Sequence, residues 1–169
     1  MSECKVDKSF SKVKLDNKPD KEQYLKDLEL IKKDGLSLKY VKKQTPKICL
    51  EAVRRCGASL QFVKKQTPKI CLEAVKENGY ALEYVKKQTP KICLEAVKRD
   101  GLALEFVKEQ TPKICLEAVK ENGYALEYVK EQTPLIVYTA FKNNCVDERL
   151  IKISKDDWEK FKKENTKLF

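Results

Sequence analysis

The chain has 169 residues, of which 41% are hydrophobic and 37% are charged, and its formal net charge at pH 7 is +10. This composition is typical of one soluble domain with heavily charged outer faces. There is no apolar run of about 18 residues, and charged side chains interrupt the N-terminus where a signal peptide needs an apolar stretch, so the sequence predicts neither a membrane span nor secretion. We therefore expect an intracellular, cytoplasmic protein in a reducing environment, with no membrane partner.

The N-terminal part differs from the rest of the chain. Residues 1–18 are polar and basic, and their few apolar side chains define no face, so we predict a flexible N-terminal arm. Residues 19–35 align with helices that follow and are predicted to form an N-terminal capping helix. Lys26 and Asp27 stand there at positions that are apolar in later copies, as expected for the solvent side of a terminal repeat.

Residues 36–144 are built from a unit of 22 residues that recurs almost unchanged. Thr-Pro opens each copy, and this pair predicts a helix start because the threonine can cap the helix and proline fits its first position. A glycine follows eleven or twelve residues later, usually after Asn or Asp, which predicts a helix end in the left-handed conformation. The threonines are Thr45, Thr67, Thr89, Thr111 and Thr133, and the glycines of the series are Gly35, Gly57, Gly79, Gly101 and Gly123.

Each unit is predicted to contain two short helices. A helical wheel for residues 46–56 gives an apolar arc of roughly 200°, wider than the stripe of an ordinary surface helix, so this helix needs neighbours on several sides. Residues 80–88 are predicted to form the second, shorter helix. A strand is the rival interpretation, because Tyr80, Leu82 and Tyr84 also alternate, but Ala, Leu, Glu, Lys and Gln favour a helix.

Helices of about 12 residues or fewer are marginal in water, so the copies must stack to be stable. The sequence therefore predicts an all-α fold: an α-solenoid of 22-residue two-helix (helix-turn-helix) repeats with N- and C-terminal capping helices. At about 8–10 Å between packed helices, the repeats make an elongated rod.

One repeat position is always cysteine and another is always aromatic. The cysteines lie near the centre of the apolar arc, and neighbouring copies are too far apart for disulfides. With no histidine and no CxxC pair, we predict buried small hydrophobes and no metal. The aromatic position is predicted to belong to the core. The cysteines are Cys49, Cys71, Cys93 and Cys115, and the aromatic residues are Tyr40, Phe62, Tyr84, Phe106 and Tyr128.

Residues 145–169 are predicted to contain a degenerate repeat and a C-terminal capping helix. Cys145 stands where the repeat would have glycine. Ser154 can cap a final helix that carries Trp158 and Phe161 on one side. We expect Trp158 to cover the open end of the core.

The candidate binding residues are one lysine per repeat and two tyrosines. A basic stripe can bind phosphate backbones, but glutamates beside other lysines also allow an ordinary solvated face. The tyrosines are candidate stacking platforms, with partial packing on the core as the alternative. These residues are Lys42, Lys64, Lys86, Lys108, Lys130, Tyr80 and Tyr124.

Catalytic chemistry has no candidate residues. The chain has no histidine and no glycine-rich phosphate loop, and its carboxylates stand beside lysines on predicted outer faces. We therefore expect no enzymatic activity, no cofactor and no small-molecule substrate.

The units GYALEYVKKQTPKICLEAVK and GLALEFVKEQTPKICLEAV closely resemble the short helical repeat family known as domain of unknown function 4116. The resemblance covers about residues 36–144, and the pairing of ALEYV with ICLEAV is specific. It implies tandem α-helical repeats and a binding or structural role, and it brings no established activity, ligand or catalytic residue.

The leading hypothesis is a non-enzymatic scaffold that binds a protein partner, not identified by the sequence, through an extended charged surface. The alternative is nucleic-acid binding through the lysine series and the basic arm. A third hypothesis, a module of a larger assembly, predicts association of isolated chains through their ends. The sequence leaves the oligomeric state open.

Overall fold

A computed structural model describes residues 18–145 and 147–165. The predicted N-terminal arm lies outside these residues except for Lys18, which begins the first helix. The α-helices are α1 (Lys18–Lys33), α2 (Pro46–Arg55), α3 (Pro68–Glu77), α4 (Pro90–Arg99), α5 (Pro112–Glu121), α6 (Pro134–Lys142) and α7 (Lys155–Glu164). The 3₁₀ helices are η1 (Gly35–Tyr40), η2 (Gly57–Phe62), η3 (Gly79–Tyr84), η4 (Gly101–Phe106), η5 (Gly123–Tyr128) and η6 (Glu148–Leu150).

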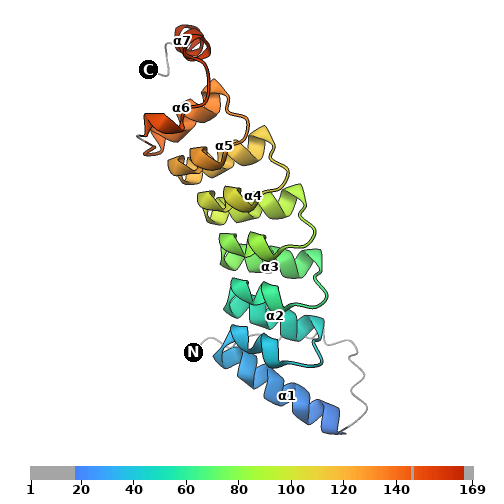
Figure 1. The fold of residues 1–169 in the computed structure, drawn as a ribbon. Helices are drawn as coiled ribbons and strands as arrows, with labels where there is room; N and C mark the ends of the chain where they lie inside the picture. The colour runs from blue at the N-terminus through green and yellow to red at the C-terminus, as the bar shows by residue number, and fades with distance from the viewer. Residues whose placement is uncertain (1–17, 146, 166–169) are drawn as a thin grey trace, which may run out of the picture.

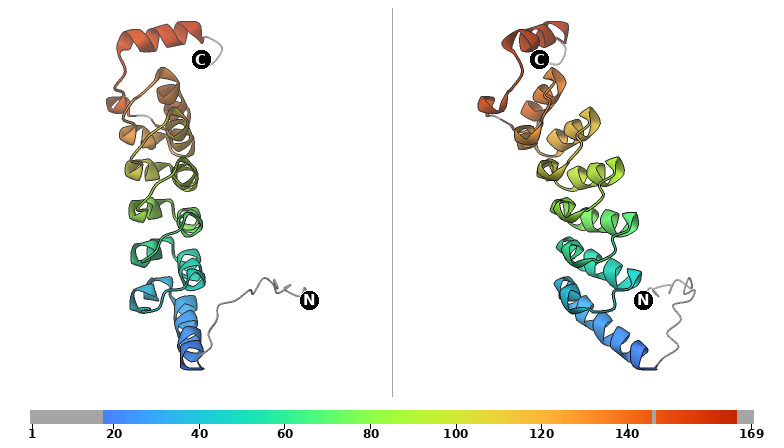
Figure 2. Two further views of the ribbon diagram at one scale, coloured as in Figure 1. Left: turned by 90° about the vertical axis from the view of Figure 1, so that its right-hand side faces the viewer. Right: turned by 45° about the vertical axis from the view of Figure 1, so that its right-hand side comes forward.

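The repeats stack into an elongated rod, as Figure 1 shows. The α-helices form one column and the 3₁₀ helices form a second column beside it, with α1 at one end of the rod and α7 at the other (Figure 2). Each of α2 to α5 packs against the α-helices before and after it and against two 3₁₀ helices. The predicted α-solenoid is confirmed, and the part of the chain that the structure describes contains no strand.

The second helix of each unit is a six-residue 3₁₀ helix and not a longer α-helix. Its hydrogen bonds run from residue i+3 to residue i, as from Ala81 N to Asn78 O at 2.9 Å and from Val85 N to Leu82 O at 3.1 Å. A 3₁₀ helix suits so short a segment, since runs of this kind are rarely long. The helix that the sequence favoured over a strand is therefore present, in a tighter form.

The Thr-Pro helix starts are confirmed in all five copies. Each threonine Oγ1 accepts a hydrogen bond from the backbone N–H three residues later, at 3.3–3.4 Å, and proline occupies the first turn. This bond satisfies one amide that the helix itself leaves unpaired.

The helix ends predicted at the glycines are confirmed, since α2 to α5 each end two residues before one, but the predicted left-handed conformation is wrong. None of them has a positive φ, and each begins a 3₁₀ helix after an extended residue such as Asn78 or Asp100. The glycines are needed because the next repeat comes too close for a side chain. A Cβ at Gly101 would lie 2.4 Å from the carbonyl oxygen of Ala118, and one at Gly57 would lie 2.5 Å from that of Ala74.

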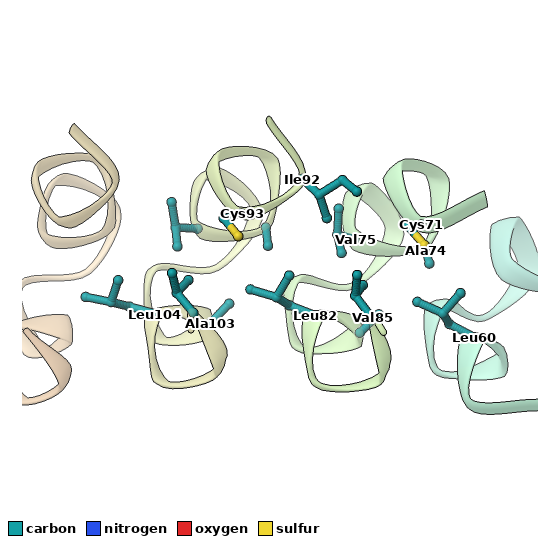
Figure 3. Packing of buried hydrophobic residues seen from close by; sticks show 14 of the residues in the cluster. Leu60, Cys71, Ala74, Val75, Leu82, Val85, Ile92, Cys93, Ala103 and Leu104 are labelled. Atoms are coloured by element: carbon teal, nitrogen blue, oxygen red, sulfur yellow. The ribbon is translucent and has the colours of Figure 1, made fainter. Parts of the chain in front are cut away.

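The core lies between the two columns and runs the length of the rod. In Figure 3, Cys71 and Cys93 point from the α-helices toward the 3₁₀ column that carries Leu82 and Leu104, and Ile92 extends from α4 toward Val75 of α3. The four repeat cysteines are 3–4% exposed and carry free thiols, as predicted, and burial raises the pKa of each thiol.

The aromatic position is less buried than predicted. Tyr40 is 68% exposed, and its counterparts Phe62, Tyr84, Phe106 and Tyr128 are half-buried against the core. Neighbouring repeats therefore cover only part of each ring. The ring of Phe106 packs against that of Tyr80 in the preceding repeat, with ring centroids 5.8 Å apart.

The two ends of the core are closed differently. In α1, Ile31 is buried while Leu25 and Leu30 remain exposed. At the other end, Cys145 is fully buried, and Trp158 lies half-buried against the core with its ring stacked on Phe161 at 5.8 Å. No helix within residues 18–145 and 147–165 is long and apolar enough to cross a bilayer.

Candidate functional site

The loops that carry the predicted lysines, between each 3₁₀ helix and the next α-helix, lie along one long edge of the rod, on the right in Figure 1. Each follows a 3₁₀ helix and precedes the Thr-Pro cap of the next α-helix, so the edge also carries the N-termini of α2 to α6. All five side chains are exposed. We call this surface the lysine edge, and its residues are Lys42, Lys64, Lys86, Lys108 and Lys130.

The helix ends add to the positive potential of the lysine edge. Successive α-helices of 9–10 residues begin there, and the N-terminus of an α-helix carries a partial positive charge. Lysine charges and helix dipoles therefore have the same sign along one line, which favours an anionic ligand.

Two of the lysines are held near the preceding loop. Lys64 Nζ donates to the carbonyl oxygen of Lys42 at 3.1 Å, and Lys130 Nζ donates to that of Lys108 at 3.0 Å. An ammonium group has three N–H donors, so one such bond leaves others for a ligand.

A glutamine beneath each lysine links neighbouring loops, and the sequence reasoning missed this role. Gln44 Nε2 donates to Phe62 O at 2.9 Å, and Gln44 Oε1 accepts from the backbone N–H of Lys64 at 3.0 Å. The same two bonds recur in every later copy at 2.8–3.1 Å. We call these residues the glutamine ladder: Gln44, Gln66, Gln88, Gln110 and Gln132.

The thiols complete this network. The Sγ–H of Cys49, Cys71, Cys93 and Cys115 donates to the Oε1 of the glutamine five residues earlier, at 3.5–3.8 Å. The presence of glutamine before every Thr-Pro was the available signal. It indicates a specific role, although the partners of each side chain lie 18 and 20 residues away.

Shallow grooves separate successive loops of the lysine edge. A groove of about 380 Å³ lies between the first two, and another of about 160 Å³ lies between the last two. Pro46, Cys49 and Ile70 line the larger groove together with Lys42, Lys64 and Lys65. Apolar walls beside ammonium groups suit a ligand that is part apolar and part anionic.

Charge along the lysine edge is uneven. Residues 41–47, 63–69 and 85–91 share the sequence VKKQTPK, with three lysines and no acidic residue each. Residues 107–113 read VKEQTPK and residues 129–135 read VKEQTPL, so a glutamate replaces the second lysine in both, and Leu135 replaces the third lysine in the last loop. The positive charge is therefore concentrated on the first three loops.

The candidate tyrosines lie apart from the lysines. Tyr80 and Tyr124, 36% and 45% exposed, begin η3 and η5, whereas the lysines follow the ends of these helices. Six residues of 3₁₀ helix span about 12 Å. Burial raises the pKa of Tyr80, and the negative charge of Asp100 and Glu105 adds to this rise. Tyr80 thus stands in partly acidic surroundings, and the two sets of candidate residues do not form one site.

Among the residues described, no group of three or more His, Cys, Asp or Glu side chains is arranged to hold a metal ion. The geometry of the lysine edge is that of a surface able to bind an extended anionic chain.

The family comparison agrees with the repeat architecture. The model of the family described as Domain of unknown function (DUF4116) matches three overlapping stretches, residues 45–89, 67–112 and 89–133, each about two repeats long. Together the matches span more than half of the chain. No curated protein and no solved structure matches it. The chain is thus a tandem array of helical repeats and belongs to the DUF4116 family.

Proposed function

We propose that this protein is a non-enzymatic scaffold that binds an acidic segment of another protein along the lysine edge. The observation that supports the proposal most is the convergence, on one side of the rod, of exposed lysines and the N-termini of five stacked α-helices. Because an α-solenoid stacks copies of one unit, equivalent residues line up along the rod and form an extended surface of this kind. The sequence, which contains no histidine, is the basis for proposing a non-enzymatic role.

The network behind the edge supports recognition by a rigid surface. Because each glutamine joins two loops through backbone groups, the spacing of the lysines is set by the stacking of the repeats. The loops are already ordered before a ligand binds, so binding loses little of their conformational entropy, which is the advantage of a preorganised site.

Nucleic-acid binding is the second candidate function, and the same positive line favours it. Proteins that bind single strands usually combine a basic groove with aromatic stacking platforms. Here the exposed Tyr80 and Tyr124 lie on the 3₁₀ column, away from the lysine edge, and Tyr80 also lies near Asp100 and Glu105. This separation favours a polypeptide ligand over a nucleic acid.

The test compares two variants of the full chain with equal net charge. Lys42→Glu/Lys64→Glu/Lys86→Glu reverses the lysine edge. Lys76→Glu/Lys98→Glu/Lys120→Glu reverses three exposed lysines in the last turns of α3 to α5, at the opposite ends of the helices. The probes are poly-L-glutamate and a random single-stranded RNA, followed by fluorescence anisotropy across a range of salt concentrations.

We expect poly-L-glutamate to bind the unmodified chain. Its affinity should fall about tenfold or more in the edge variant and change little in the control, because salt screens the ligand from charges that lie far from its binding surface. Equal loss in both variants, or no binding of poly-L-glutamate, would contradict the proposal. RNA binding with a steep salt slope, without poly-L-glutamate binding, would establish the second candidate in its place.

A further inference from the structure

The lysine edge has a regular spacing that restricts the conformation of its ligand. A single glutamine side chain bridges two successive loops by hydrogen bonds, as Gln66 does with the backbone of Tyr84 and Lys86. Successive loops therefore lie close together. This short bridge agrees with the distance of about 8–10 Å at which helices pack. A ligand that contacts every loop must therefore present a similar group about every 9 Å.

Among regular backbones, the polyproline II helix has this spacing. It makes one turn in three residues at about 3.1 Å per residue, so every third side chain returns to the same face after about 9 Å. Side chains on one face of a β-strand recur after about 6.7 Å, and one turn of an α-helix covers about 5.4 Å. Neither of these shorter periods matches the distance between neighbouring repeats.

The composition of the edge indicates which side chains the ligand presents. The loops at residues 41–47, 63–69 and 85–91 offer three lysines each and no acidic group, so carboxylates are the complementary partners. The groove between the first two loops has Pro46, Cys49 and Ile70 in its walls, which suits a prolyl ring or a short aliphatic side chain.

We propose that the lysine edge binds an acidic, extended segment of a partner protein in the polyproline II conformation, with an aspartate or glutamate at every third position. The proposal rests on the proposed function and names the conformation and register of its ligand. Each acidic side chain meets the lysines of one loop, while the two intervening residues cross the groove to the next loop.

Synthetic peptides of equal composition test the register. One peptide is (Glu-Pro-Pro)₅. A second has the same five glutamates and ten prolines, with the glutamates contiguous, and a third has them at every second position followed by prolines. All three have the same charge and favour the same backbone conformation. Binding of fluorescein-labelled peptides to the full chain is measured by anisotropy, beside poly-L-glutamate and the random RNA.

We expect (Glu-Pro-Pro)₅ to bind about tenfold more tightly than either rearranged peptide. This preference should disappear in Lys42→Glu/Lys64→Glu/Lys86→Glu and persist in Lys76→Glu/Lys98→Glu/Lys120→Glu. Circular dichroism of both variants checks that the helices are intact, so that lost binding is attributed to charge.

The outcomes separate this inference from the proposed function. If the three peptides bind equally and poly-L-glutamate also binds, the register is wrong while acidic-chain binding stands. If neither the peptides nor poly-L-glutamate bind, both proposals are overturned. Tighter binding of RNA than of every peptide would overturn the inference by making the edge a nucleic-acid interface.

Discussion

The first three loops of the lysine edge and the last two make the same contacts with their neighbours and yet carry different charges. Gln44, Gln66 and Gln88 link the first loops to the following repeats, and Gln110 and Gln132 do the same further along with nearly equal distances. The residue just before each of these glutamines is lysine in the first three loops and glutamate in the last two.

This difference separates the positions that build the rod from those available for recognition. The glutamine, threonine and proline are the same in the five copies from residue 44 to residue 134, and the glycine is the same in five copies from Gly35 to Gly123, because each makes or permits a contact with the backbone. The charged position beside the glutamine changes without altering the stacking contacts. Binding properties can therefore vary along the rod while its structure stays the same.

Gly101→Ala is the substitution expected to damage the stacking most. The new Cβ would lie 2.4 Å from Ala118 O and 2.9 Å from Asn122 N, and both contacts are with the backbone of the next repeat. The repeats must move apart, which we expect to cost about 3 kcal/mol or more. Guanidinium unfolding followed by circular dichroism measures this loss.

Lys98→Ala, an exposed change in α4, is the control for Gly101→Ala and should shift the midpoint little. A glycine variant as stable as this control would mean that the close approach of the repeats has been misjudged.

Gln88→Ala tests the glutamine ladder and should have the next largest effect. It removes the hydrogen bonds to Phe106 O at 2.8 Å and from Lys108 N at 3.1 Å. Water can reach this half-buried site in part, so we expect a loss of about 1–2 kcal/mol in the free energy of unfolding. The same denaturant titration measures it.

Gln61→Ala is the matched control for the ladder. The Gln61 amide is exposed and bonds to Ala58 O within its own repeat. Its removal should change stability by less than about 0.5 kcal/mol. Equal losses of unfolding free energy in the two glutamine variants would show that a hydrogen-bonded link between repeats stabilises the fold no more than a bond within one repeat.

The sequence predicts features whose cause lies within one unit and misses those that depend on the next unit. Thr-Pro caps act within one turn, and the apolar arc follows from the helical period, so helix starts and buried cysteines are correctly predicted. Two features depend on how the repeats stack: the close approach of Ala118 to Gly101 and the hydrogen-bond partners of Gln88. A pattern within one repeat does not predict them. The exposure of Tyr40 likewise depends on neighbours that a repeat position alone does not reveal.

For the candidate site, the lysine positions and their exposure follow from the repeat pattern. Their placement beside five helix N-termini, and their separation from Tyr80 and Tyr124, required the structure.

Glu109→Lys/Glu131→Lys gives the last two loops the lysine that precedes the glutamine in the first three, although Leu135 still stands where those loops have a third lysine. We expect this variant to bind (Glu-Pro-Pro)₅ about three- to tenfold more tightly, because the basic line becomes longer. Stability should hardly change, since neither side chain takes part in the glutamine network. Anisotropy titration measures the affinity.

Glu121→Lys/Glu164→Lys adds the same charge at exposed sites in α5 and α7, away from the lysine edge. If this control tightens binding as much, net charge and not position governs the affinity, and the contrast between the loops has no role in recognition.

The smallest effect is expected for Glu73→Gln, which removes an ion pair between repeats on the outer side of the α column. Arg54 Nε lies 2.6 Å from Glu73 Oε2, but the two side chains are 54% and 26% exposed, so solvent screening should limit the pair to less than about 1 kcal/mol.

The hydrogen bond from Arg54 lowers the pKa of the Glu73 carboxyl, so its contribution is present above the pKa of the unfolded chain, about 4.3, and is lost as pH falls through the lower folded value. Unfolding of the two proteins at pH 7 and pH 3 measures the effect, which should be present at pH 7, smaller at pH 3 and weaker in high salt. A loss as large as that of Gln88→Ala would mean that exposed charge pairs stabilise the stack as much as the half-buried glutamine ladder does.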